Sequence, residues 1–246
     1  MRLRVSLIAL SFPWLFTLPV RAGNAIVHDT DPINLPLLGN SGQTHVTAFF
    51  GQKAEGVHLT AAVAVAPRVA LIAAAAYANH NNCFSCRVSE RRHGELGIGT
   101  YHRETGTGMV WETYFGGGMG RAKLSGGDEG SDQISELRVT GSEYQTLYAQ
   151  ANLGKRLKWD DRAGALRLAG YKFTGLTLQD GNGQSLPVNG TGWGFYLEPA
   201  LVYRLGYRAV KLDLQLGASL PLIQPEGLDN EKIWATLGIG FDILGN

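Results

Sequence analysis

Apolar and polar side chains alternate without interruption over residues 209–221. One parity is apolar: Val210, Leu212, Leu214, Leu216, Ala218 and Leu220. The other parity is polar or small: Lys211, Asp213, Gln215, Gly217 and Ser219. A period of two is typical of a β-strand with two different faces. A strand of about nine to eleven residues that separates lipid from a polar lumen has this pattern. The segment therefore predicts a transmembrane β-strand.

The same alternation recurs along the chain and predicts ten strands. They cover residues 43–51, 56–66, 69–78, 93–104, 109–122, 144–158, 163–178, 191–206, 208–221 and 231–243. The run 69–78 is apolar on both faces, which leaves a short helix as an alternative there. The run 163–178 changes phase near Gly170, and a β-bulge would explain the change.

The predicted connections are alternately short and long. Short polar turns join the second strand to the third, the fourth to the fifth, the sixth to the seventh and the eighth to the ninth. Bacterial barrels have an even number of strands, short periplasmic turns and longer external loops. We therefore expect an all-β fold, a transmembrane antiparallel up-and-down β-barrel of about ten strands over residues 43–246. Residues 23–42 are expected to form an irregular periplasmic N-terminal segment. The main alternative fold is a secreted β-sandwich, whose strands would place their polar faces in solvent.

The start of the chain has the features of a signal peptide. Arg2 and Arg4 precede an apolar run from Val5 to Val20, and small residues follow it. This arrangement predicts a signal peptide over residues 1–22 that is removed on export. Its removal changes the formal net charge from +1 to about −2. That charge disfavours a nucleic-acid partner.

The last predicted strand resembles the C-terminal assembly signal of bacterial outer-membrane proteins. The resemblance rests on Thr236, Gly238, Phe241 and Ile243, although the chain continues to Asn246 where an aromatic residue usually ends it. Together with the strand pattern, nearly the whole chain resembles the small outer-membrane β-barrel family of Gram-negative bacteria. The resemblance implies an outer-membrane location, contact with outer-membrane lipid and insertion by the outer-membrane assembly machinery. It implies no activity and leaves any external ligand unknown.

Cys83 and Cys86 form a Cys-x-x-Cys motif in a predicted long loop, with His80 and His93 nearby. In an oxidising compartment, two neighbouring cysteines favour a local disulfide. A zinc site and redox-active thiols are the alternatives. We expect the disulfide, with no metal site and no cofactor.

Charged residues of both signs fall on the inward parity of the predicted strands. They are Glu95, Arg103, Glu112, Arg156, Glu198, Arg204, Lys211, Asp213 and Asp242. In a narrow barrel, buried charges must pair or be hydrated. An ion-pair network that fills the lumen is the favoured interpretation, and a narrow diffusion pore with mixed charge is the alternative.

The sequence does not favour an enzyme. The six histidines are scattered through the first half of the chain, and no Ser-His-acid spacing or Gly-x-Ser-x-Gly motif accompanies them. We therefore predict no catalytic residues and a non-enzymatic envelope component whose external loops are available for recognition. An outer-membrane enzyme, of protease or lipid-modifying type, is the remaining alternative.

Overall fold

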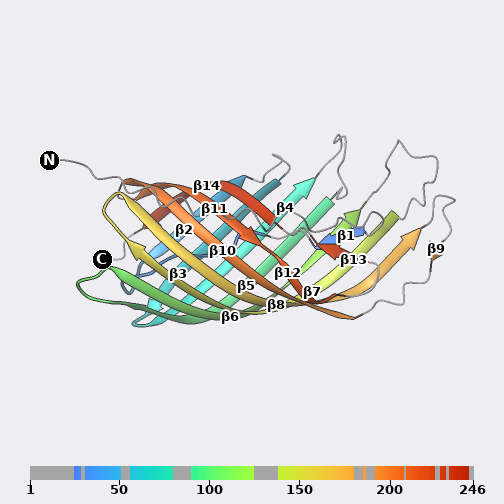
Figure 1. Cartoon of the computed structure of the whole chain (residues 1–246), viewed down its shortest axis with the longest axis horizontal. Coiled ribbons are helices and arrows are strands. Elements are labelled where there is room, and N and C mark those ends of the chain that lie inside the picture. Colours follow the sequence, from blue (N-terminus) through green and yellow to red (C-terminus); the bar gives the residue numbers. More distant parts are fainter. Residues whose placement is uncertain are drawn as a thin grey trace, which may run out of the picture.

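The computed structural model describes most of the chain and shows a closed β-barrel (Figure 1). The described residues are 25–28, 31–50, 56–79, 90–124, 138–179, 185–186, 192–207, 209–224, 228–230 and 233–243. No helix in these ranges is long and apolar enough to cross a membrane.

Ten antiparallel strands form the wall of the barrel. They are β2 (Thr44–Phe50), β3 (Gly56–Ala66), β4 (Val69–Asn79), β5 (Glu90–Arg103), β6 (Met109–Leu124), β7 (Arg138–Arg156), β8 (Asp160–Gln179), β10 (Trp193–Tyr207), β11 (Val210–Ala218) and β14 (Ile233–Ile243). Each pairs with its neighbours along the chain, β10 pairs with both β8 and β11, and β14 pairs with β2 to close the ring. The prediction of an all-β up-and-down barrel of ten strands is confirmed. The two-sheet sandwich alternative is wrong, because one continuous sheet closes on itself.

Four shorter strands extend the structure at one end. β1 (Ala25–His28) and β13 (Leu228–Asn230) form a parallel pair, with β1 lying against β6 and β7. β9 (Ser185–Leu186) pairs with the end of β8, and β12 (Leu220–Ile223) pairs with the start of β10. These four strands lie at one end of the barrel, beside the end of β8 and the start of β10.

The two ends of the barrel differ in their connections. At one end, here called the turn end, short turns join β3 to β4, β5 to β6, β7 to β8 and β10 to β11. Gly106 has a φ of 99° and Gly108 a φ of 71° in the β5–β6 turn, a conformation that favours glycine. The opposite end is called the loop end.

The strands alternate between an apolar outer face and a largely polar inner face. On β11, Leu212, Leu214 and Leu216 are each about half exposed, whereas Lys211 and Asp213 are buried inside. β4 is paired along its length with β3 and β5, so the helix alternative for 69–78 is wrong. Pairing with two neighbouring strands thus shows that residues 69–78 form a strand, which their periodicity alone left ambiguous.

The bulge predicted near Gly170 is also wrong. β8 keeps a continuous register through Gly170 with both β7 and β10. The apparent change of phase has another cause: Leu166 and Leu168 are apolar and face outward, whereas Tyr171 and Phe173 are aromatic and face the lumen. The irregular register of β7 and β8 lies nearer the loop end, around Gly141.

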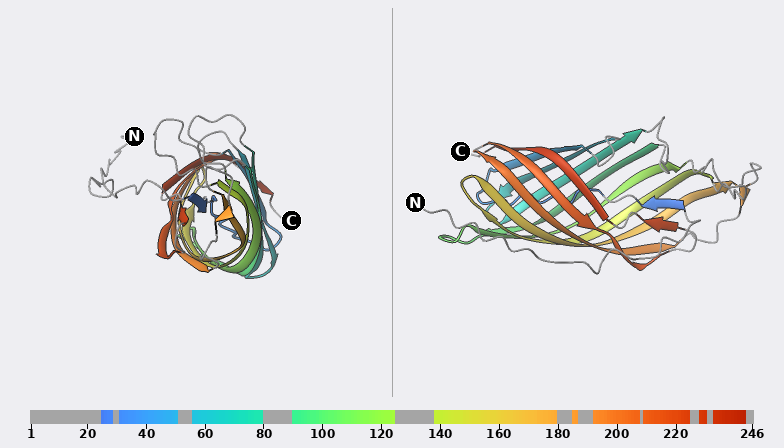
Figure 2. Two further views of the ribbon diagram at one scale, coloured as in Figure 1. Left: turned by 90° about the vertical axis from the view of Figure 1, so that its right-hand side faces the viewer. Right: turned by 45° about the horizontal axis from the view of Figure 1, so that its top comes forward.

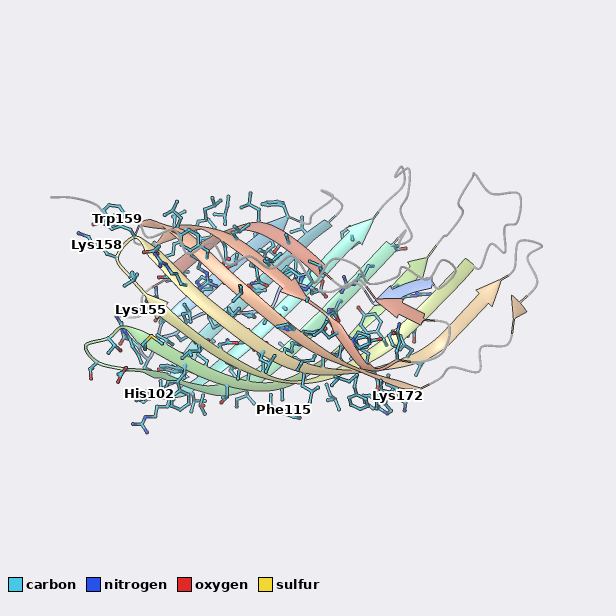
Figure 3. The ribbon with its side chains drawn as sticks, in the orientation of Figure 1. His102, Phe115, Lys155, Lys158, Trp159 and Lys172 are labelled. Atoms are coloured by element: carbon cyan, nitrogen blue, oxygen red, sulfur yellow. The ribbon has the colours of Figure 1, made fainter. Side chains whose placement is uncertain are left out.

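Polar side chains on the outer face recur at the same separation on the two adjacent strands β7 and β8. Arg162 and Lys172 on β8 are ten residues apart, and so are Gln145 and Lys155 on β7. Those residues are opposite one another, since Lys155 pairs with Arg162 and Gln145 with Lys172. Between them the outward residues are apolar or glycine: Leu147, Ala149, Ala151, Leu153, Gly164, Leu166, Leu168 and Gly170. Figure 3 shows Phe115 between His102 and Lys172 along the length of this outer face.

Side chains and part of the chain itself fill the lumen. One buried cluster contains Tyr101, Tyr114, Tyr144, Tyr148, Tyr171 and Tyr196 with small apolar residues. A Cβ on Gly97 or Gly116 would lie 2.5 Å from the Tyr148 hydroxyl oxygen, so these glycines make room for the Tyr148 side chain to lie along the wall over β6 and β5. A second cluster packs Trp234, Val202 and Ala200 around Ile33 and Leu35, which come from the segment that precedes β2.

Candidate functional site

Residues 31–43, here called the lumen segment, run through the inside of the barrel without regular secondary structure. Ile33, Leu35, Leu37 and Leu38 are all at most 1% exposed. The segment follows β1 at the loop end and leads into β2, which begins at the turn end (Figure 2). The chain therefore crosses the barrel once as an internal segment before it forms the wall. Sequence analysis predicted the segment to be periplasmic and did not predict its place in the lumen.

Side chains of the wall bind the backbone of the lumen segment in place of a neighbouring strand. The Gln215 side-chain oxygen accepts from the Ile33 N–H at 2.6 Å, and its amide donates to the Ile33 carbonyl at 3.0 Å. The Gln150 amide donates to the Asn34 carbonyl at 2.7 Å. Buried backbone groups need such partners, and an irregular segment cannot supply them itself.

Charged wall residues bind the next part of the lumen segment. The Leu38 N–H donates to the Glu112 carboxylate at 2.6 Å, and the Asn152 amide donates to the same carboxylate at 2.9 Å. The Arg156 guanidinium donates to the Leu37 carbonyl at 3.1 Å, and Arg204 donates to the Leu35 carbonyl. Leu37 has a φ of 53°, an uncommon conformation for leucine that these contacts hold.

The segment also binds the wall from its own side. The Asn34 side-chain amide donates to the carbonyls of Ala61 at 2.8 Å and Ala73 at 3.2 Å, which belong to the paired strands β3 and β4. The Gly42 N–H donates to the Ala64 carbonyl of β3 at 2.8 Å, and within the segment the Gly39 N–H donates to the Gln43 side chain at 2.8 Å. Contacts in both directions fix the position of the segment along the lumen.

Asp31 anchors the end of the lumen segment that is nearer the loop end. Its carboxylate accepts from Arg91, lies 2.8 Å from His93 Nδ1 and lies 3.2 Å from His58 Nδ1. Inside the barrel, one guanidinium and two imidazoles therefore surround this carboxylate. The contact between Arg91 and Asp31 makes the anchor an ion pair.

A second group of charges lies beside the Asp31 anchor. Arg167 binds Glu95 with both terminal nitrogens, one of them at 2.9 Å, and its Nε lies 3.4 Å from Glu198. The guanidinium carbon of Arg167 lies 4.0 Å from the centre of the Tyr148 ring. His93 Nε2 lies 3.4 Å from Glu95, which connects this group to the anchor. One network thus joins the segment to β5, β8 and β10.

A third group of charges lies near the turn end. The Asp242 carboxylate lies 2.8 Å from His45 Nδ1, 2.5 Å from the Arg156 guanidinium and 3.5 Å from the Lys211 ammonium. Lys211 also donates to Asp161.

Arg204 and Asp213 form a neighbouring pair, with Arg204 Nε donating to Asp213 at 2.6 Å. Their side chains are 2% and 0% exposed, so neither charge is hydrated by bulk water and each is stabilised by the other.

The structure places the sequence-predicted charges in two ways. Inside the barrel lie Glu95, Glu112, Arg156, Glu198, Arg204, Lys211, Asp213 and Asp242, distributed over the three groups and the lumen-segment contacts. Arg103 shares their inward parity but is exposed where β5 ends at the turn end, with its side chain beside Gly39 of the lumen segment. The four residues of the C-terminal signal resemblance divide by face: Thr236 and Gly238 point inward, and Phe241 and Ile243 point outward. Cys83 and Cys86 lie outside the described residues.

Sequence reasoning missed several charged or titratable members of these groups, among them Asp31, His45, Arg91, His93, Asp161 and Arg167. Arg91 shares the parity of Glu95, but the predicted strand began only at residue 93. Asp161 was assigned to a turn, and Arg167 lay in the strand whose phase was misread. A strand start two or three residues earlier on β5 and β8 would have included Arg91 and Asp161.

The charged groups in the lumen bind the lumen segment through hydrogen bonds and ion pairs. Their carboxylates and cations are engaged with one another or with the segment, as the distances above show. Across the described parts of the chain, no group of three or more His, Cys, Asp and Glu side chains is arranged to hold a metal ion.

Comparisons with known proteins add no family to this description. No protein-family model, no curated protein and no solved structure matches the chain.

Proposed function

We propose that this chain is a closed outer-membrane β-barrel of a Gram-negative envelope, exported with a cleaved signal peptide and inserted by the outer-membrane assembly machinery. In this proposal the protein is a non-enzymatic surface component. The loop end faces outward and is available for recognition, and the turn end faces the periplasm. The outer face of the wall carries the proposal.

The apolar band on the outer face has the height of a membrane core. The polar borders on β7 and β8 are ten residues apart. At about 3.3 Å per residue and a strand tilt of about 40°, ten residues rise about 25 Å, which is the height typical of outer-membrane barrels. Trp111, Trp159 and Tyr207 are exposed toward the turn end, as expected for an interfacial girdle. A soluble barrel would have no reason to expose this many large apolar side chains in one band.

The lumen segment supports a closed barrel over the alternative of a diffusion pore. Open pores keep a hydrated path between charged walls. Here the leucines of the segment and the paired charges of the wall occupy the described lumen together. Because the histidines of the Asp31 anchor are buried and bound to that carboxylate, the site also favours a structural role over catalysis.

The membrane location is tested by extraction and by gel migration. We expect the protein to require detergent for extraction from the outer-membrane fraction and to migrate faster in unheated than in boiled samples. Full solubility without detergent, or identical migration under both conditions, would contradict the proposal.

The closed lumen is tested separately in planar bilayers. We expect no steady current from the full mature chain and a measurable conductance from a variant that lacks residues 23–40. Heat-modifiable migration of the variant would verify that its barrel still forms. A steady current from the full chain would support the diffusion pore instead.

A further inference from the structure

We propose that the outer face at the turn end binds one anionic phospholipid, with its phosphate held by Lys155 and Arg162. This inference rests on the proposed membrane location and adds a specific ligand to it. The site, here called the turn-end patch, comprises Lys155, Lys158, Trp159, Arg162, Tyr203 and Tyr207. These residues come from the end of β7, the following turn, the start of β8 and the end of β10.

The patch has more positive than negative charge. Lys155 and Arg162 are direct cross-strand partners, and like charges in that position repel each other. Arg162 Nε binds Asp160 at 2.8 Å, but no carboxylate among the described residues binds Lys155 or Lys158. An anion placed between Lys155 and Arg162 would relieve their repulsion and complete the pairing.

Aromatic rings surround these cations. Trp159 and Tyr207 stack with their centres 4.5 Å apart, and the Lys158 ammonium lies 5.7 Å from the Trp159 ring. The Arg162 guanidinium lies 5.9 Å from the Tyr203 ring. Figure 3 shows Lys155, Lys158 and Trp159 together at this end of the barrel. Aromatic rings of this kind prefer the depth at which lipid headgroups lie.

Next to the charged pair, the apolar band has a position without a side chain. Gly164 lies two residues from Arg162 on the same face, between Leu153 of β7 and Leu201 of β10. Both leucines are more than half exposed. The absence of a side chain at Gly164 leaves space between them for an acyl chain whose headgroup lies at Lys155 and Arg162. This combination favours a lipid over free phosphate.

The opposite border of the band lacks this combination and provides a matched control. Arg92 and Arg121 are also cross-strand partners on the outer face. Arg92, however, binds Glu90 at 2.8 Å, and Arg121 lies opposite Glu143. Each arginine there has an acidic neighbour, so the border has less need of an external anion.

The first test measures lipid retention by the full mature chain. The purified barrel is incubated with phosphatidylglycerol or phosphatidylcholine, and bound lipid is counted by native mass spectrometry. We expect one retained phosphatidylglycerol and about tenfold weaker retention in the double variant Lys155→Gln/Arg162→Gln. The variant Arg92→Gln/Arg121→Gln makes the same change of charge and should retain the lipid. Equal retention by both variants, or equal loss, would overturn the proposed site.

The second test separates a lipid site from a phosphate site. Gly164→Leu fills the space between Leu153 and Leu201 without touching the cations, so it should weaken phosphatidylglycerol retention several-fold. If the site recognises phosphate alone, Gly164→Leu has no effect and inorganic phosphate displaces the lipid, which would contradict the acyl-chain contact. Heat-modifiable migration of each variant reports barrel formation independently. A failure of the membrane proposal is thereby distinguished from a failure of the lipid site.

Discussion

Arg204 and Asp213 show how a single residue pair in the lumen depends on both of its members. Arg204 donates to Asp213 and to the Leu35 carbonyl, and both side chains are almost fully buried. We expect Arg204→Met to lower the free energy of unfolding by about 3–5 kcal/mol, because it leaves the Asp213 carboxylate buried without its cation. The shift in the temperature of the gel-migration change measures this loss.

The double variant Arg204→Met/Asp213→Leu is the control for this interpretation. Replacing both charges by apolar groups removes the unpaired carboxylate, so more than half of the lost stability should return. If the double variant is less stable than Arg204→Met, Asp213 stabilises the barrel by something other than its pairing with Arg204.

Gly217 provides a second prediction at the level of one residue. It faces the lumen, and a Cβ there would lie 2.2 Å from the Trp234 ring, which is 2% exposed. Gly217→Ala should therefore displace Trp234 and lower the free energy of unfolding by about 1–3 kcal/mol. The expected readouts are a lower unfolding temperature and a change in tryptophan fluorescence. Gly164→Ala, whose Cβ would have contacts of 3.7 Å, should change neither.

Among the elements, the strands could be predicted from sequence and the lumen segment could not. Strands that separate two environments alternate at period two, and this signal located all ten strands of the wall. Nine agree to within three residues at each end, whereas β7 begins six residues earlier than predicted. The errors at residues 69–78 and 163–178 arose where both faces are apolar, because aromatic and small residues also line the lumen. Parity then no longer distinguishes the inner face from the outer face.

The lumen segment has no such local signal. Its proline, asparagine and leucine residues are typical of an irregular connection, and its burial depends on side chains far away in the sequence, such as Gln215 and Arg204. The charges that bind its backbone, Glu112, Arg156 and Arg204, were predicted to lie in the lumen. Asp31 and its partners Arg91 and His93 were not. Contacts separated by more than a hundred residues cannot be deduced from a local period.

The two hydrogen bonds from Gln215 to the Ile33 backbone are here called the Gln215 clamp. A variant without this clamp tests how much the lumen segment contributes. Gln215→Leu removes both hydrogen bonds to Ile33 and leaves a buried N–H and carbonyl without that partner. We expect the free energy of unfolding to fall by about 2–4 kcal/mol. Brief openings in planar bilayers should accompany this loss as the segment loosens. Gln145→Leu changes the same residue type on the outer face and should produce no openings, and openings in both variants would argue against the clamp.

For the whole molecule, the inner face of the wall accommodates charged side chains, whereas we expect the outer face to be destabilised by them. The lumen already contains three groups of paired charges, whereas the outer band between Arg162 and Lys172 contains none on β8. Leu168 lies within that band and is 45% exposed. In water an exposed leucine tolerates replacement by arginine with little change in stability. In a bilayer the same replacement is costly.

Leu168→Arg therefore distinguishes the proposed membrane barrel from a soluble one. In lipid vesicles, we expect it to reduce the folding free energy by about 2–4 kcal/mol, because the guanidinium would lie near the middle of the hydrocarbon core. Gln145→Arg adds a charge at the border of the band and should change the free energy by about 1 kcal/mol or less. Urea titration followed by gel migration gives both values. Equal, small effects of the two variants would mean that the apolar band does not face lipid, because only in lipid does the cost of an arginine depend on its position along the barrel.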